Sequence, residues 1–172
     1  MTAISTFPVL GTAHLTLREM RSDDVDGYAE LLTDPEESHF NVDAAVSADE
    51  VPAKIARNRA ARSEGRSIYW AIEWAGGFAG FVALHGPATE APALSYAVRR
   101  GCRRRGVASE AVGAVLTYAF EVLGAAQVSA RTHPENAASA LLLAGLGFTD
   151  QGRVETAHGT RRQFSLGAPA SK

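Results

Sequence analysis

The sequence predicts one α/β domain of the α+β type, in which helices flank a mostly antiparallel sheet with one parallel junction. Residues 67–98 read as successive strands, whereas residues 108–166 alternate strand and helix, and parallel strands are joined by a crossover connection that is usually a helix. With 172 residues, 46% of them hydrophobic, the chain is long enough to bury one core. We therefore expect a single domain over residues 1–172.

The first third of the chain is expected to form one strand and two helices. His14–Arg18 alternates apolar and polar residues, as a half-buried strand does. Ser22 is placed to cap a helix that stops before Asp34–Pro35, because the residue before a proline avoids helical geometry. Ser47–Glu50 has the form of a capping box and opens a second, mostly polar helix that ends near Gly65.

The middle of the chain alternates with period two, which indicates strands. Ser67–Trp74 places its large apolar side chains on one face and predicts a half-buried strand. Gly76–Gly77 is a hairpin signal, and Phe78–Leu84 is the expected partner strand. After a loop that contains two prolines, Ala93 to about Val98 forms the next strand.

From Ala108 the hydrophobic period changes to that of a helix. Apolar residues recur at helical spacing as far as Leu123, and Gly124 supplies the stop. The elements that follow are a strand at Gln127–Arg131, a helix from Asn136 to Leu143, and two strands at Phe148–Glu155 and Arg161–Leu166 joined around His158–Gly159. Strands that part at the parallel junction leave a crevice, in which ligands tend to bind.

The composition argues against several classes of protein. The formal net charge is -2, which gives no reason to expect general nucleic-acid binding. The single cysteine, Cys102, cannot form an internal disulfide, so a reducing cytoplasm is the simplest setting. No segment approaches the roughly 20 apolar residues that cross a bilayer, and the N-terminus has no secretory pattern. We therefore expect a cytoplasmic protein that does not enter a membrane.

Arg99–Ala108 is the most informative stretch of the chain, because it places five arginines within seven residues of a slightly acidic protein. Gly106 stands at the start of a helix, where backbone N–H groups lack intrahelical partners and the helix dipole is positive. Such a terminus favours phosphate. The spacing is not that of a nucleotide P-loop, because Val107 and Ala108 stand where Lys and Ser or Thr are needed. We expect a phosphorylated cofactor to bind here.

Arg103-x-x-Gly106-x-Ala108 resembles the Q/R-x-x-G-x-G/A signature of the GNAT superfamily of acetyl-CoA-dependent N-acetyltransferases. Residues 103–111 look like the R-G-x-G-x-A-T-E-A block of its RimJ/RimL branch, whose best-known members acetylate the N-termini of ribosomal proteins. Arg104 stands where that branch usually has glycine. The further matching blocks are Leu15-x-Leu17-Arg18, Asp34-Pro35-Glu36, Trp70-Ala71-Ile72, Tyr118–Gly124, and Asn136–Ser139 with Leu146-Gly147-Phe148. The resemblance covers about residues 13–166 and implies the GNAT fold.

The resemblance implies acetyl-CoA as the cosubstrate, with the coenzyme A pyrophosphate on the backbone N–H groups at the helix start. These groups, with arginine side chains beside them for the 3'-phosphate, belong to Arg103, Arg104, Arg105, Gly106, Val107, Ala108 and Ser109. The strand at Tyr96, Ala97 and Val98 would pair with the pantetheine arm, and a bulge there would aim an N–H at the thioester oxygen. Asn136 would also hold the arm; an ordinary helix cap is the structural alternative.

Direct attack of an amine on the thioester needs an acid and a base rather than a covalent intermediate. By the resemblance, Ser139 protonates the departing thiolate; a helix-face serine without a catalytic role is the alternative. We favour Glu155 as the base and consider Glu73 and His158 too, each of which is otherwise an ordinary surface residue. Cys102 has no ordered histidine partner and is interpreted as a bystander. The five histidines show no ligand spacing, so no metal is expected.

The sequence therefore predicts an N-acetyltransferase that acts on a primary amine, either a protein N-terminus or a small molecule. A non-catalytic module that binds or senses acyl-CoA is the alternative, and the presence of Asn136 and Ser139 favours the enzyme. RNA or ribosome binding through Arg99–Arg105 is a third hypothesis, weakened because the charge is confined to one loop. Residues 34–65 would form one wall of the acceptor site. A homodimer is considered because related proteins often pair.

Overall fold

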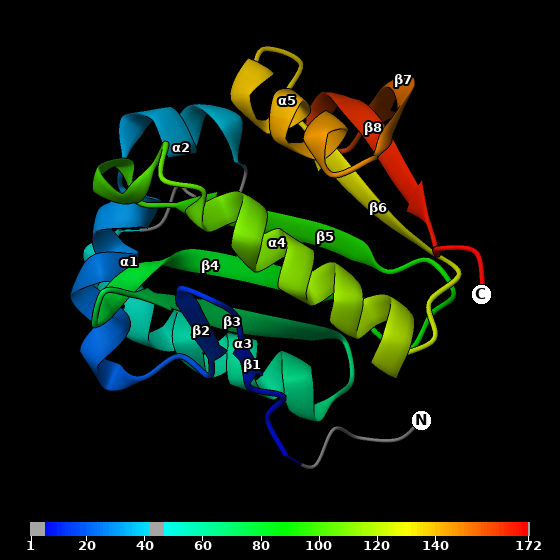
Figure 1. Cartoon of the computed structure of the whole chain (residues 1–172). Coiled ribbons are helices and arrows are strands. Elements are labelled where there is room, and N and C mark those ends of the chain that lie inside the picture. Colours follow the sequence, from blue (N-terminus) through cyan, green and yellow to red (C-terminus); the bar gives the residue numbers. More distant parts are fainter. Residues whose placement is uncertain (1–5, 42–46, 172) are drawn as a thin grey trace.

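The computed structural model describes residues 6–41 and 47–171, which form one mixed sheet of eight strands with helices on both faces (Figure 1). The strand order is β1-β2-β3-β4-β5-β6-β8-β7, and only β5 and β6 pair in parallel. The bounds are β1 Leu10–Gly11, β2 Leu15–Arg18, β3 Ser67–Trp74, β4 Gly77–His85, β5 Ala93–Val98, β6 Gln127–Thr132, β7 Thr149–Thr156 and β8 Gly159–Gly167. The predicted fold class is confirmed.

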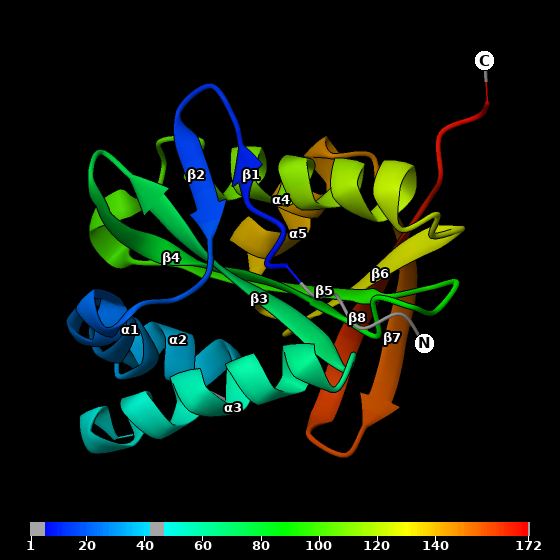
Figure 2. The same ribbon diagram turned by 90° about the horizontal axis from the view of Figure 1, so that it is seen from below.

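The helices cover the two faces of the sheet, with α1, α2 and α3 on one face and α4 and α5 on the other (Figure 2). Their bounds are α1 Val25–Leu32, α2 Pro35–Phe40, α3 Val51–Ser63, α4 Val107–Thr117 and α5 Ala137–Gly145. Short turns η1 Ser22–Asp24, η3 Ala48–Glu50 and η4 Arg100–Cys102 precede α1, α3 and α4, and α4 continues as a π-helical segment, η5 Tyr118–Val122. None of the helices in the described residues is long and apolar enough to span a membrane.

Two apolar clusters hold the layers together, one on each face of the sheet. The larger cluster packs the sheet against α4 and includes Trp70 and Val112, both fully buried. The smaller cluster packs the sheet against α1 and α3 and includes Tyr28 and Ala71, also fully buried. The prediction that β3 is half-buried is therefore wrong, because α1 and α3 cover the face that the alternation had left to solvent.

Helix boundaries differ from the prediction where side chains compete for the backbone. Ser22 does not cap α1; instead the Asp24 carboxylate accepts from the Arg21 N–H at 2.7 Å and from both terminal nitrogens of Arg18 at 2.8 and 2.9 Å. Arg18 and Asp24 are both buried, so this pair fixes the start of α1 against β2. The predicted capping box is confirmed, since the Ser47 N–H donates to Glu50 Oε2 at 2.9 Å.

Two further local predictions needed correction. The β3–β4 turn is made by Ala75 and Gly76, with φ of 50° and 80°, rather than by Gly76 and Gly77. A two-residue hairpin turn of this kind requires positive φ at both central residues. Helix α2 was not predicted; Asp34 caps it by accepting from the Glu36 N–H at 2.9 Å, and Pro35 occupies its first turn.

The parallel junction opens into a gap. β5 pairs with β6 only at Ala93 and Leu94, opposite Ser129 and Ala130, whereas it pairs with β4 along its whole length. Beyond Leu94 the unit of β6, β8 and β7 turns away from the rest of the sheet (Figure 1). The remaining four residues of β5 therefore have a strand on one side and a gap on the other, as the sequence predicted for a splayed junction.

Candidate functional site

The start of α4 presents a row of backbone N–H groups without hydrogen-bond partners among the described residues. The first backbone bond of the helix runs from the Glu110 N–H to the Gly106 carbonyl. Gly106 has φ 75° and ψ 5°, and no heavy atom lies within 4 Å of the position that its Cβ would take. The unpaired N–H groups belong to Arg104, Arg105, Gly106, Val107, Ala108 and Ser109. This arrangement fits an anion such as a diphosphate.

The arginine side chains of this stretch are less available than the sequence suggested. Three of the five are held by acidic residues that lie on or beside α1 and α2: Arg99 by Glu30, Arg100 by Asp34 at 3.0 Å, and Arg103 by Glu36 and Glu37 at 2.8 Å each. The prediction that the Arg103 side chain meets a phosphate is therefore corrected, because its guanidinium is already paired. The Arg103 N–H is also paired, because it donates to the Arg100 carbonyl at 3.3 Å.

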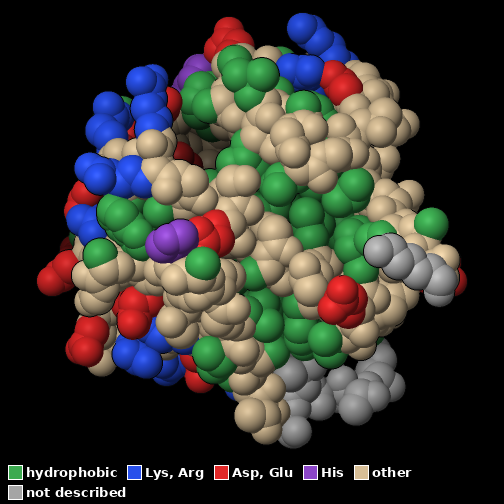
Figure 3. Space-filling view, in the orientation of Figure 1, with side chains coloured by type: hydrophobic (Ala, Val, Ile, Leu, Met, Phe, Trp, Pro, Cys, Tyr) green, Lys and Arg blue, Asp and Glu red, His purple; other side chains and the backbone are tan. Residues whose placement is uncertain are grey.

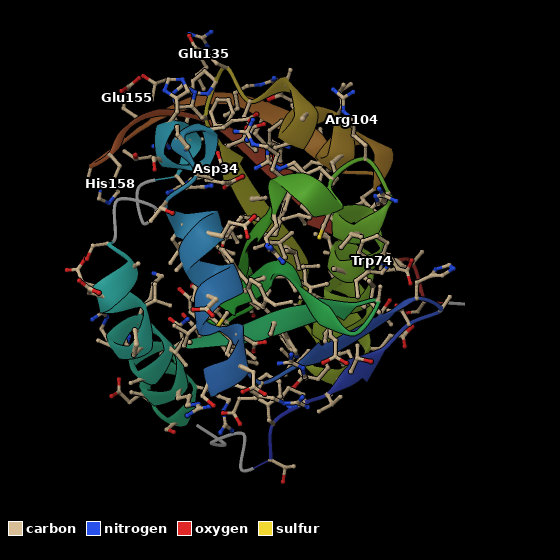
Figure 4. All side chains as sticks on the ribbon, turned by 90° about the vertical axis from the view of Figure 1, so that its left-hand side faces the viewer. Asp34, Trp74, Arg104, Glu135, Glu155 and His158 are labelled. Carbon is tan, nitrogen blue, oxygen red and sulfur yellow. The ribbon has the colours of Figure 1, made fainter. Side chains whose placement is uncertain are left out.

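Arg104 and Arg105 are exposed and unpaired with carboxylates of the described chain. Arg104 points outward (Figure 4) and has φ 61°, a left-handed conformation that glycine adopts without strain. This accounts for the glycine that is usual here in the sequences that the loop resembles. The Arg105 guanidinium lies 5.5 Å from the centre of the Trp74 ring. Lys and Arg side chains gather over η4 and the start of α4, beside a hollow in the surface (Figure 3).

Successive residues of β5 direct their backbone N–H and C=O groups alternately toward β4 and toward the gap. The Arg99 N–H donates to the Ala79 carbonyl on β4. By strand alternation the backbone of Ala97 also faces β4, whereas Tyr96 and Val98 face the gap. The expected bulge is wrong, since the β4–β5 register runs without a shift. Even without a bulge, the Tyr96 N–H points into the gap. The backbone groups of Ala97 point toward β4, so the prediction that Ala97 pairs with a ligand in the gap is corrected.

Tyr96 and Ser139 meet across the gap. The Tyr96 Oη and the Ser139 Oγ lie 2.6 Å apart and join β5 to the first turn of α5. Burial raises the pKa of the Tyr96 phenol, which therefore stays protonated at neutral pH. The Asn136 side chain accepts from the Ser139 N–H at 3.1 Å, so its capping role is confirmed. The predicted acid thus lies beside the gap together with a second hydroxyl.

A cleft of about 260 Å³ opens on the opposite face of the same stretch of β5. α1 and α2 form one wall, β4 and β5 form the floor, and β6 with the β7–β8 hairpin forms the other wall. Tyr96 and Ala97 line the floor of the cleft, and both belong to the part of β5 that borders the gap. A ligand on the helix α4 side and a second ligand in the cleft would therefore meet at β5.

Comparison with known proteins agrees with this geometry. The model of the acetyltransferase (GNAT) domain family matches residues 14–149. The chain belongs to the GNAT acetyltransferase family. It is 30% identical over 152 residues, 85% of each chain, to the uncharacterized N-acetyltransferase YoaA of Bacillus subtilis (strain 168).

Solved structures with the same fold include RimJ and RimL. Mycobacterium smegmatis RimJ in complex with CoA-disulfide matches with a TM-score of 0.80 and 19% identity over 94% of this chain and 88% of that chain. RimL, a ribosomal L7/L12 alpha-N-protein acetyltransferase in complex with coenzyme A, matches with a TM-score of 0.81 and 16% identity over 94% and 98%. The GNAT architecture is thereby confirmed, and this chain is an N-acetyltransferase of that family.

The bases expected for this acetyltransferase are not equally well placed. The Glu73 carboxylate is bound by Arg18 Nε at 2.6 Å and does not line the cleft. Glu155 is exposed, accepts from the Thr160 hydroxyl at 2.6 Å, and also lies outside the cleft lining, which corrects the preference for it. His158 does line the cleft. Glu155 and His158 belong to the β7–β8 hairpin, which lies on the other side of α2 from Arg104 (Figure 4).

No special role was predicted for His85, which the structure places in the cleft. Its Nδ1 lies 2.9 Å from the Ser67 hydroxyl on β3, and its Nε2 lies 2.8 Å from the Ser95 hydroxyl on β5. Ser95 and His85 both line the cleft, whereas Ser67 is buried. The available signal was the hairpin register, since Ser67 and His85 are direct partners on β3 and β4.

Two histidines that are far apart in the sequence, His39 and His133, also lie close together. His39 Nε2 lies 3.0 Å from a Glu135 oxygen, and the His39 and His133 rings lie 4.9 Å apart, so α2 contacts the loop before α5. The possible ligand atoms of these three residues all lie within 4.8 Å of one another. Spacing along the chain gave no sign of this cluster, and the expectation of no metal stays a prediction.

Proposed function

We propose that this acetyltransferase moves the acetyl group of acetyl-CoA directly to a primary amine held in the cleft. The observation that carries the proposal is the position of β5. The edge of β5 that borders the gap ends next to the loop that carries the unpaired N–H groups of α4. The face of β5 turned toward α1 and α2 forms the floor of the cleft. Two substrates bound side by side would react without a covalent enzyme intermediate.

The residues present fit the cosubstrate. The unpaired N–H groups at residues 104–109 would receive the diphosphate, and the missing side chain of Gly106 lets it approach the backbone. Hydrogen bonds to a charged group of this kind contribute about 1.5–3 kcal/mol each. The gap-facing edge at Tyr96 and Val98 would pair with the pantetheine arm as an added strand. RimJ and RimL, which share this fold, have been solved with CoA-disulfide and with coenzyme A, which supports coenzyme A as the carrier.

Tyr96 and Ser139 would handle the thioester. The Tyr96 N–H would stabilise the negative charge that develops on the carbonyl oxygen. As the carbon–sulfur bond breaks, the Ser139 hydroxyl would donate its proton to the sulfur, while the Tyr96 phenol, 2.6 Å away, donates to the Ser139 oxygen. Because the raised pKa of Tyr96 keeps the phenol protonated, it can serve as this donor at neutral pH.

Ser95 and His85 would receive the proton that the amine loses. A cleft-bound ammonium next to Ser95 would give a proton to the Ser95 oxygen, and Ser95 would pass its own proton to His85 Nε2, 2.8 Å away. Ser67, hydrogen-bonded to Nδ1, would hold the tautomer that leaves Nε2 unprotonated. We prefer this route to Glu155, whose carboxylate lies outside the cleft lining.

The experiment is a free-thiol assay of the purified protein with acetyl-CoA and a panel of amines. The panel contains ribosomal-protein N-terminal peptides, amino acids, polyamines and amino sugars. We expect release of one equivalent of coenzyme A thiol per acetylated amine for at least one class. Tight coenzyme A binding without acetylation of any amine would instead favour the non-catalytic acyl-CoA module.

A further inference from the structure

We propose that the amine acceptor carries a negatively charged group within a few bonds of its amine. This inference rests on the proposed function and adds the chemical class of the acceptor. It is based on the charges that line the cleft, on its size, and on the pairing of its one described carboxylate.

Three cations line the cleft from different elements: Lys54 on α3, Arg131 on β6 and Arg161 on β8. None of them forms an ion pair with a carboxylate of the described residues. The Arg131 Nε donates to the Gln163 side chain at 2.7 Å, and one Arg161 nitrogen donates to the Thr160 carbonyl at 3.1 Å. The other guanidinium nitrogens remain available, and unpaired cations that converge on one cleft favour an anionic ligand.

The only carboxylate among the described lining residues is already engaged. Glu37 Oε1 accepts from Arg103 at 2.8 Å, and Glu37 Oε2 accepts from the Asn41 amide at 2.7 Å. Arg103, which does not line the cleft, thus balances the negative charge of Glu37. The three cations keep their charge toward the ligand, and His85, His133 and His158 add no negative charge.

The size and the lining restrict where the anion can lie. A volume of about 260 Å³ lies at the small end of ligand pockets, which run from about 300 to 1,000 Å³, so the cleft suits one small amine or the first residues of a peptide. Apart from the paired Glu37, the wall on the side of α1 and α2 is mostly apolar and includes Leu31, Leu32 and Phe40. The anion must therefore belong to the same small molecule as the amine, or to the first residues of a peptide.

The same cations would help the chemistry. A positive charge near the bound amine disfavours its protonated form and so lowers its pKa, which promotes proton loss to Ser95 and His85. Acceptors with several positive charges, such as polyamines, would be repelled by the cleft. An anionic substituent on the acceptor offsets this repulsion and orients the amine.

The test uses pairs of acceptors that differ only in charge. Phosphoethanolamine is compared with ethanolamine for the phosphate arm, and the amide-capped peptides Ser-Glu-Ala-Ala and Ser-Gln-Ala-Ala for the carboxylate arm, with spermidine as the cationic acceptor. We expect kcat/KM to be about tenfold or more higher for the anionic member of at least one pair, as for one added charge-assisted hydrogen bond. The advantage should shrink as ionic strength rises.

Variants locate the effect in the cleft. Arg161→Gln and Lys54→Gln should each reduce the preference for the anionic acceptor about fivefold or more. The controls Arg153→Gln and Arg57→Gln remove the same charge from exposed positions of β7 and α3 outside the cleft and should leave the preference unchanged. Equal or better use of the neutral member by the native protein overturns the inference and leaves the proposed function intact.

A binding measurement covers the case in which no amine is acetylated. That result counts against the proposed function, and calorimetric titration of phosphoethanolamine and ethanolamine into the coenzyme A-saturated protein then decides the inference. Tighter binding of the phosphate compound, lost in Arg161→Gln, supports an anion site. Equal affinity for the two compounds contradicts it.

Discussion

Ser139 and Tyr96 show how single residues define the chemistry at the gap. They come from β5 and α5, and their hydroxyl oxygens lie 2.6 Å apart beside the edge where β6 has diverged. The hydrogen bonds of His85 go instead to Ser67 on β3 and Ser95 on β5. The proposed acid and the proposed base therefore belong to separate hydrogen-bonded groups that both include a residue of β5.

Replacing Ser139 by Ala tests the acid. Loss of a general acid lowers a rate by about 100-fold or more, so we expect kcat to fall to that extent. The dissociation constant of coenzyme A should change little, because the Asn136 cap uses the backbone N–H of residue 139, which alanine retains. Steady-state kinetics and calorimetry measure the two quantities. An unchanged kcat in a variant with normal coenzyme A affinity removes Ser139 from the mechanism.

At the scale of elements, α2 is attached to η4 by ion pairs rather than by an apolar face. None of its residues is buried, yet Asp34, Glu36 and Glu37 contact Arg100 and Arg103. These contacts hold one wall of the cleft next to the loop at α4. They also neutralise arginines that would otherwise suggest nucleic-acid binding.

Replacing Asp34 by Asn tests this attachment through pH. Asn still caps α2 but cannot pair with Arg100, whose hydrogen bond lowers the pKa of Asp34 from 3.8 to about 2. A carboxylate with a lowered folded pKa adds stability above its ordinary value and loses it as the pH falls through the folded value. We expect a lower urea midpoint than native at neutral pH, and a difference that shrinks as the pH falls from about 4 toward the folded pKa of about 2 and is lost below it.

The control for this prediction is Asp26→Asn, at an exposed position of α1 without an ion pair among the described residues. Its urea midpoint should stay near the native value throughout. A midpoint for the Asp34 variant that differs from the native value equally at neutral pH and near pH 2 would show that the Arg100 pair adds no stability.

Elements with a strong local signal could be predicted from the sequence, whereas contacts between distant segments could not. The start of α4 at Gly106 and the cap at Asn136 follow from spacing and residue type alone. The pairing of Arg103 with Glu36 and Glu37 depends on packing α2 against η4, and no local pattern encodes it. The hydrogen-bonded chain Ser67–His85–Ser95 was missed for a different reason, because a shift in register between Ile72 and Glu73 changes the partners that the β3–β4 turn alone would assign.

For the whole molecule, the sheet separates two surfaces that we propose bind the two substrates. The α4 side presents unpaired N–H groups, the α1 and α2 side presents the cleft, and the divergence of β6 leaves β5 reachable from both. The acetyltransferase family signature predicted the first surface. The second depends on residues within 34–41 and 47–65 and on the β7–β8 hairpin, and for this region the sequence predicted only one wall of the acceptor site.

The central claim is that the N–H groups at the start of α4 bind the diphosphate of coenzyme A. Calorimetric titration of coenzyme A into Gly106→Glu, with Gly101→Glu as the control, tests it most directly. Gly101 lies in the same turn, has open space at its Cβ position and does not require a positive φ, so it adds the same charge without blocking the loop. We predict loss of binding in Gly106→Glu, with a thermal melt that confirms folding, and near-native affinity in Gly101→Glu. Near-native affinity in the folded Gly106 variant would contradict the account.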